Sequence, residues 1–200
     1  MPAREIVPGI LTWQWFSERN GYDFNGMLLL HGGGNVAVDP VDMPEDVLDQ
    51  LAGAGVSRIV LTNRNHFRAA AKLKAKTSAR VAVHPADAAF VRGQGVEVDD
   101  DLAVGARLAG FEVLDASGKS PGEVALWNAE RRILVVGDAC VGKPPGQLAL
   151  LPPKVIDDLP RLKDSLRRLA ELPAEMVLVG DGAPVLRSGR EALQALVRTF

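Results

Sequence analysis

The segment from residue 58 to residue 75 constrains the fold of this chain more than any other. It opens with the short apolar run Arg58 to Thr62, which is typical of a buried strand. A polar stretch, residues 63–66, follows, and Phe67 to Ala75 has the composition of a helix. A buried strand that ends in polar side chains and leads into a helix is a building unit of layered folds. The segment therefore predicts a sheet with helices packed against it.

The rest of the chain repeats this unit in two halves. Both halves are predicted to place strands first and helices afterwards. The predicted strands are Ile10 to Phe16, Met27 to His31, Asn35 to Val38, Arg80 to Val83, Ala106 to Leu108, Glu112 to Leu114, Glu123 to Trp127, Ile133 to Val136 and Met176 to Val179. The further predicted helices are Met43 to Ala54 with Asp42 as its cap, a turn starting at Pro85, Val155 to Leu172, and a closing helix from a Ser188 cap to Arg198. The order favours an α/β fold that is a four-layer αββα sandwich of two mixed sheets flanked by helices.

Composition limits the size and surroundings of this fold. Two hundred residues with 47% hydrophobic content suit a single domain, residues 1–200. The net charge is −2 and the basic residues are dispersed, so we expect no nucleic-acid partner. No apolar run approaches the roughly 20 residues of a membrane span, and no signal-like segment stands at the start. The expectation is a cytoplasmic protein without a membrane partner.

Five short segments, spread over most of the chain, resemble the motifs of the metallo-β-lactamase superfamily. In that family a strand ends in Thr-His-x-His-x-Asp-His, and later motifs include Gly-His-Thr-Pro-Gly, a Gly-Asp pair and a final Gly-His-Gly. The matching segments here, in chain order, are Gly33 to Pro40, Thr62 to Arg68, Gly118 to Gly122, Val136 to Ala139 and Gly180 to Gly182. The resemblance implies the fold predicted above and a metal site at the ends of its strands.

The resemblance also shows what has changed at that site. Aligning Thr62 puts non-histidine residues on the four ligand positions of the first motif, namely Asn63, Asn65, Phe67 and Arg68. Lys119 and Asp181 replace later histidines, and Asp138 matches the bridging aspartate. A catalytic zinc site takes three protein ligands from His, Cys, Asp or Glu. The chain has three histidines, of which His66 falls between ligand positions, so we expect no zinc hydrolase and no metal cofactor.

The replacements suggest that charged side chains stand in for the metal. Arg68 and Lys119 would bring positive charge beside Asp138 and Asp181, and Asn63 and Asn65 complete this pocket. We expect a buried ion-pair network in which the loss of one member is costly. An Asp138→Ala variant should therefore melt at a lower temperature than a variant of a surface aspartate.

Three residues near this pocket carry more than one interpretation. Asn65 precedes a helical segment and is expected to cap it. His66 is interpreted as an exposed first-turn residue or a hydrogen-bond partner, although its imidazole is also a candidate base. Cys140 is interpreted as a small buried hydrophobe, and reactivity would need Arg68 or Lys119 to lower its pKa.

Three functions stay open at this point. The leading one is a metal-free pseudoenzyme that binds a small molecule or a partner protein. The second is a hydrolase that holds one hard divalent cation through Asp138, Asp181 and the Asn63 carbonyl. The third is metal-free chemistry, in which Lys119 and Arg68 stabilise an anion and His66 or Asp138 moves a proton. The apolar closing helix also suggests a homodimer.

Overall fold

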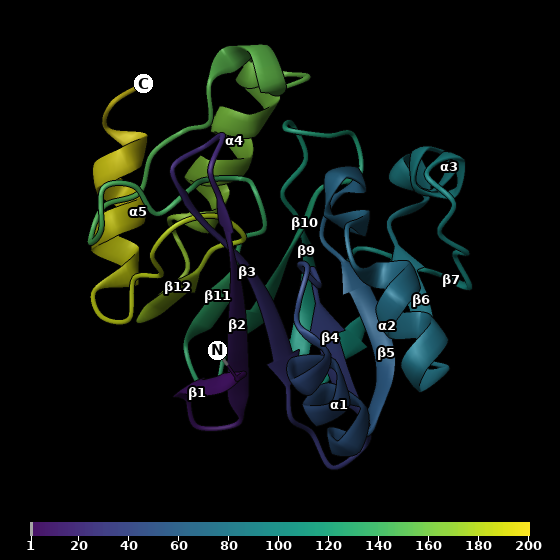
Figure 1. Ribbon diagram of the computed structural model, residues 1–200. Coiled ribbons are helices and arrows are strands. Elements are labelled where there is room, and N and C mark those ends of the chain that lie inside the picture. The colour runs from purple at the N-terminus through teal and green to yellow at the C-terminus, as the bar shows by residue number, and fades with distance from the viewer. Residues whose placement is uncertain (1) are drawn as a thin grey trace.

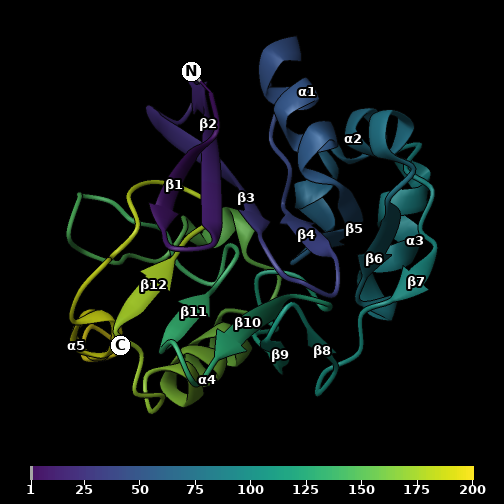
Figure 2. The same ribbon diagram turned by 90° about the horizontal axis from the view of Figure 1, so that it is seen from below.

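The computed structural model describes residues 2–200 and contains two β-sheets packed face to face between two groups of helices (Figure 1). Viewed along the layers, helices α1, α2 and α3 cover one sheet, and α4 and α5 cover the other (Figure 2). This arrangement confirms the predicted αββα fold with two mixed sheets. No helix in residues 2–200 is long and apolar enough to cross a bilayer.

The first sheet has seven strands whose order in space follows their order in the chain. Its strands are β1 (Arg4–Val7), β2 (Ile10–Ser17), β3 (Tyr22–Leu29), β4 (Asn35–Val38), β5 (Val56–Leu61), β6 (Arg80–Val83) and β7 (Asp100–Asp101). Strands β1 to β4 are antiparallel, and β4 to β7 are parallel because helices connect them.

The second sheet has five strands in the order β12-β11-β10-β9-β8. They are β8 (Arg107–Leu108), β9 (Phe111–Asp115), β10 (Val124–Asn128), β11 (Ile133–Val135) and β12 (Met176–Leu178). The pairs are antiparallel except for β11 with β12, which are parallel. The second sheet is therefore also mixed.

Alternation along the strands explains why two sheets share one interior. In β10, Val124 and Leu126 face the core between the sheets, whereas Ala125 and Trp127 face α4 and α5. Strand β5 alternates in the same way, since Val60 lies between the sheets and Ile59 and Leu61 face the helical layer. Successive side chains point to opposite faces, and both faces of each sheet are covered. Strands of this kind are apolar throughout, which is why the sequence pattern indicates them.

The helices are α1 (Glu45–Ala54), α2 (Ala70–Thr77), α3 (Pro85–Gly93), α4 (Leu159–Leu169) and α5 (Gly189–Val197), with short 3₁₀ turns η1 (Arg64–Phe67) and η2 (Pro153–Val155). The predicted helix from Phe67 was wrong at its start, because η1 and α2 are separate pieces. The predicted helix from Val155 was too long, since Asp158 caps α4 and Pro160 lies in its first turn.

One predicted cap was wrong, and a second was right in position only. The N-cap of α1 is Pro44, and Asp42 instead accepts a hydrogen bond from the amide of Met43. Ser188 is the N-cap residue of α5, as predicted, but its side chain makes no capping hydrogen bond and its φ is 55°. Residue type alone does not settle whether a side chain caps a helix.

Candidate functional site

The candidate site lies where the parallel strands of both sheets end. Asp39 follows β4, His66 lies in η1 just after β5, Asp138 follows β11 and Asp181 follows β12. The sheets are joined at this edge, since the amide of Val124 donates to the carbonyl of Thr62 at 2.9 Å. The carboxyl ends of parallel strands meet at one edge of a sheet, and loops there carry the functional side chains.

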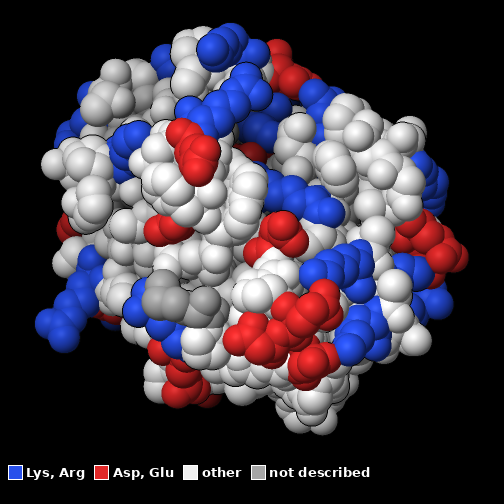
Figure 3. Space-filling model, viewed as in Figure 1, with Lys and Arg blue, Asp and Glu red and all other residues white. Residues whose placement is uncertain are grey.

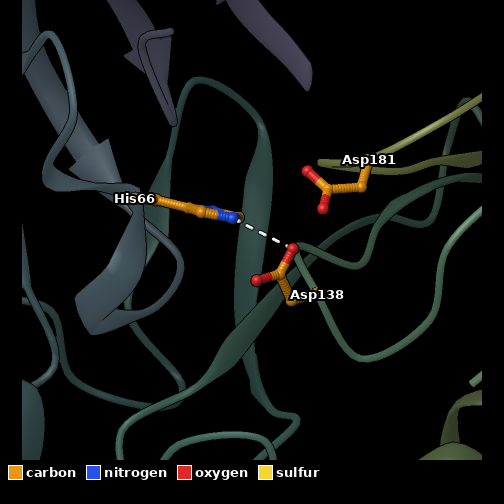
Figure 4. A group of neighbouring side chains, drawn as sticks. All are labelled: His66, Asp138 and Asp181. Atoms are coloured by element: carbon orange, nitrogen blue, oxygen red, sulfur yellow. Dashed lines mark ion pairs between the residues drawn. The ribbon is translucent and has the colours of Figure 1, made fainter. Parts of the chain in front are cut away.

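His66 is the centre of this site. Its side chain is fully buried, with Nδ1 2.8 Å from Asp39 Oδ2 and Nε2 3.0 Å from Asp138 Oδ1. Figure 4 shows the ring pointing from η1 towards Asp138, with Asp181 beyond it. Burial alone would lower the pKa of His66, but Asp138 and Asp39 outweigh it and raise the pKa to about 10. His66 is therefore an imidazolium that holds a proton on both nitrogens.

Asp39 is held in place by Thr62. Its Oδ1 accepts a hydrogen bond from the Thr62 amide at 2.7 Å, and its Oδ2 accepts one from Thr62 Oγ1 at 2.6 Å. Asp39 has a φ of 50°, a left-handed conformation that aspartate tolerates better than most residues. The geometry of two neighbouring strand ends thus fixes one of the two carboxylates that enclose His66.

Lys119 occupies the other side of Asp138. Its buried ammonium lies 3.0 Å from Asp138 Oδ2 and donates a hydrogen bond to Asn65 Oδ1 at 2.5 Å. Burial alone would raise the pKa of Asp138, but His66 and Lys119 hold it well below its ordinary value. Asp138 is therefore a carboxylate with one cation on each oxygen.

Arg68 and Asp181 form a looser pair. Arg68 Nη2 lies 3.7 Å from Asp181 Oδ1, and the guanidinium stacks on the ring of Phe24 at 4.0 Å. Arg68 Nη1 and Asp181 Oδ1 are both buried without a hydrogen-bond partner among residues 2–200. Burial, with the nearby charge of Asp138, raises the pKa of Asp181 to about 7.

Glu123 is a fourth acidic side chain in the site that the sequence did not indicate. It is buried, and its Oε1 accepts hydrogen bonds from the Asp138 amide at 2.7 Å and from Asn63 Nδ2 at 3.4 Å. Burial and the charge of Asp138 raise its pKa well above the ordinary value. The uncharged form of Glu123 is therefore favoured more strongly than in an exposed glutamate.

The structure corrects two interpretations made from the sequence and confirms a third. The helix cap is Asn63, whose Oδ1 accepts from the Asn65 amide at 2.8 Å, so the prediction that Asn65 is the cap was wrong. The interpretation of His66 as an exposed first-turn residue was also wrong, because it is fully buried. Cys140 is fully buried, which confirms its interpretation as a small buried hydrophobe, and burial raises the pKa of its thiol, with Glu123 and Asp138 adding to it.

Two glycines allow the backbone to pack closely against the site. A Cβ atom on Gly180 would lie 2.8 Å from His66 Cε1, which leaves no room for a side chain. Gly137 precedes Asp138 with a φ of 55°, and a Cβ there would lie 2.4 Å from Thr62 Oγ1. The backbone therefore approaches the buried imidazolium more closely than any other residue type would permit.

Asp87 forms hydrogen bonds with two of the loops that carry site residues. Its Oδ2 accepts hydrogen bonds from the Arg64 amide at 2.9 Å and from Ser120 Oγ at 2.5 Å, and its Oδ1 accepts one from the Gly122 amide at 3.0 Å. It is fully buried in the first turn of α3. This residue connects η1 to the loop that carries Lys119.

The side chains present do not fit the pair of metal ions that the resemblance implies. His66, Asp138 and Asp181 have ligand atoms within 4.8 Å of one another. However, both nitrogens of His66 face carboxylates, and Lys119 takes the second oxygen of Asp138. The Asn63 carbonyl oxygen is used as a helix cap, and Phe67 offers no ligand atom. The site is a set of internal ion pairs in the arrangement that the structure shows.

Comparison with known proteins identifies the family. The family model described as "Metallo-beta-lactamase superfamily" matches residues 5–200. The chain belongs to the metallo-beta-lactamase superfamily. The search of curated protein sequences found no match.

Solved structures of this superfamily have the same fold. One is TTHA1623 in a di-iron-bound form, with 29% identity and a TM-score of 0.68 over 90% of this chain and 96% of that one. A metallo-beta-lactamase from Pontibacter korlensis has 16% identity and a TM-score of 0.78 over 99% of both chains. A metallo-beta-lactamase family protein from Thermus thermophilus, TTHA1429, has 20% identity and a TM-score of 0.71 over 98% of this chain and 80% of that one.

Proposed function

We propose that this chain is a metal-independent member of the metallo-beta-lactamase superfamily that binds a small molecule and does not hydrolyse it. The observation that carries this proposal is the buried imidazolium of His66 between Asp39 and Asp138, with Lys119 on the far oxygen of Asp138. Cations of the chain itself thereby neutralise the carboxylates of the strand ends.

The charges at the site support metal independence. Three cationic side chains, His66, Lys119 and Arg68, stand beside the carboxylates of Asp39, Asp138 and Asp181. Bringing a divalent ion among them would add two positive charges to a buried and already balanced cluster. Lys119 or His66 would first have to leave Asp138, and the buried ammonium of Lys119 would then have lost the carboxylate that it pairs with.

The same geometry disfavours metal-free acid–base chemistry at His66. A general base needs a free lone pair within reach of the proton it removes. Both nitrogens of His66 face carboxylates, and the ring has no exposed surface. Lys119 is buried and already engaged by two acceptors. The polar centre is therefore suited to holding the loops in place rather than to moving protons.

A second candidate function is a hydrolase with one hard cation. The close approach of His66, Asp138 and Asp181 favours it, and Asp181 Oδ1 has no hydrogen-bond partner among the described residues. Asn63 would not be a ligand of this ion, since its side-chain oxygen Oδ1 accepts from the Asn65 amide. An ion between Asp138 and Asp181 would lie next to the cations of His66 and Arg68, which makes this the weaker candidate.

Thermal denaturation of untagged protein with added zinc, manganese or magnesium separates the two candidates. Metal independence predicts the same melting temperature with each ion and after chelator treatment. A ligand that binds only the folded state raises the melting temperature as its concentration rises above the dissociation constant. A rise with manganese or magnesium that the Asp181→Asn variant lacks would establish a cation site at Asp181 and contradict metal independence.

A further inference from the structure

An open groove of about 430 Å³ lies beside the buried ion pairs. It is lined by Trp15 on β2, by Asp42 before α1, and by Arg68, Ala69 and Lys72 at the start of α2. We call this set of residues the mouth groove. Its volume falls within the range of about 300–1,000 Å³ that small-molecule pockets have.

Arg68 gives the mouth groove a cation with one unused donor nitrogen. Its Nη1 has no hydrogen-bond partner among the described residues, and Nη2 pairs with Asp181 Oδ1 only at 3.7 Å. The side chain is 21% exposed, and its guanidinium carbon lies 4.0 Å from the centre of the Phe24 ring. A guanidinium fixed in one plane binds a carboxylate with two parallel hydrogen bonds.

Trp15 gives the mouth groove an apolar wall. Its side chain is 43% exposed although it packs on the ring of Phe24, with the ring centroids 5.5 Å apart. Phe24 thus supports both the indole of Trp15 and the guanidinium of Arg68. A flat apolar group on Trp15 and an anionic group on Arg68 would belong to one ligand.

The side chains that line the groove include two cations, Arg68 and Lys72, and one acidic residue, Asp42. An anion in the groove would share the cation of Arg68 with Asp181, which is 3.7 Å from it. Lys72 is anchored at the rim, since its ammonium donates to the Met43 carbonyl at 3.1 Å and pairs with the exposed Glu45 at 3.0 Å. Acidic and basic side chains are interspersed over the face shown in Figure 3.

We infer that the mouth groove binds a small aromatic carboxylate, with its ring on Trp15 and its carboxylate on Arg68. This inference rests on the proposed function, because a divalent ion next to Asp181 would change the charge that Arg68 faces. It deepens that function by giving the chemical class of the ligand.

Benzoate is the probe, and isothermal titration on chelator-treated protein of measured metal content is the test. Acetate lacks the ring and benzyl alcohol lacks the charge, so each should bind at least about tenfold more weakly than benzoate. Trp15→Ala and Arg68→Gln should each weaken benzoate about tenfold, and Lys72→Gln about threefold. The matched control is Arg107→Gln, whose side chain is 81% exposed on the second sheet and should leave binding unchanged.

Benzoate binding no better than acetate would overturn the inference, as would unchanged affinity in Trp15→Ala. If Arg68→Gln fails to fold, the Trp15 and Lys72 variants decide, because both side chains are at the surface. If the protein contains no metal and does not bind benzoate, the proposed class of ligand is refuted, and metal independence is not affected. Stoichiometric metal would refute the proposed function itself, whatever benzoate does.

Discussion

At the scale of single residues, the carboxylates of the site pair with cations of the chain itself. His66 and Lys119 each contact one oxygen of Asp138, and Asp39 balances His66 from the other side. Desolvating such charges costs several kcal/mol per ion, so the pairs hold only while every member is present. We therefore expect large effects from small chemical changes at these positions.

Asp138→Asn should lower the free energy of unfolding by about 3–5 kcal/mol, because it leaves the buried cations of His66 and Lys119 without their shared carboxylate. Urea denaturation at neutral pH measures this. The matched control is Asp164→Asn, since Asp164 pairs with Arg167 on the surface of α4 and its side chain is 63% exposed. Equal losses in the two variants would contradict the presence of buried ion pairs at Asp138.

His66 should make stability depend on pH in the alkaline range. Its pKa is raised from 6.5 to about 10 in the folded protein, so its contribution is complete below about pH 6.5 and is lost as the pH rises through about 10. The wild-type free energy of unfolding should fall across this window more steeply than that of His66→Gln. Denaturation at several pH values checks this, with the exposed His31→Gln as the control that keeps the wild-type slope.

Sequence motifs located Lys119, Arg68, Asp138 and Asp181 because each stands at a fixed place in a recognisable segment. They did not locate Glu123, which directly precedes β10 and belongs to no motif, and they placed His66 near the pocket without indicating that it is buried. Whether a histidine is buried depends on packing by distant segments such as Gly180, which the local sequence does not reveal. The sequence indicated that Asp39 ends an apolar strand, but it did not indicate that Asp39 pairs with His66.

At the scale of elements, apolar periodicity located the strands well and the helix ends poorly. Strands β4 and β6 begin and end at the predicted residues. Helix α4 begins later than predicted because Asp158 and Pro160 set its start, whereas the apolar periodicity already begins before them. Boundaries depend on caps and backbone turns, which compete locally with the apolar pattern.

Asp87 in α3 should be as important to the site loops as the ion pairs themselves. Asp87→Ala removes the acceptor for two amides and a hydroxyl, so we expect a loss of about 3 kcal/mol in the free energy of unfolding. Hydrogen exchange at the amides of Arg64 and Gly122 should also become faster.

Asp46→Ala is the matched control for Asp87, because Asp46 lies in the first turn of α1 but is exposed. Asp46→Ala should leave hydrogen exchange at those amides unchanged. It should change the free energy of unfolding by no more than about 0.5 kcal/mol. Unchanged exchange at Arg64 and Gly122 in Asp87→Ala would show that α3 does not hold the site loops.

At the scale of the whole molecule, the chain has the fold of the superfamily to which it belongs. The family model spans residues 5–200, and the structure of TTHA1623 in a di-iron-bound form aligns over 90% of this chain. The two sheets still bring the ends of β4, β5, β11 and β12 to one edge. A fold supports many functions, so the site residues decide what this member does.

The central claim is that cations of the chain, rather than a metal ion, neutralise the carboxylates of the site. The most direct test is the metal content of untagged protein, measured by plasma mass spectrometry before and after dialysis against a chelator. The ion pairs predict a metal-to-protein ratio near zero in both samples and the same unfolding curve for both. A stoichiometric ratio before dialysis, lost together with stability afterwards, would contradict metal independence and make His66, Asp138 and Asp181 ligands of a bound ion.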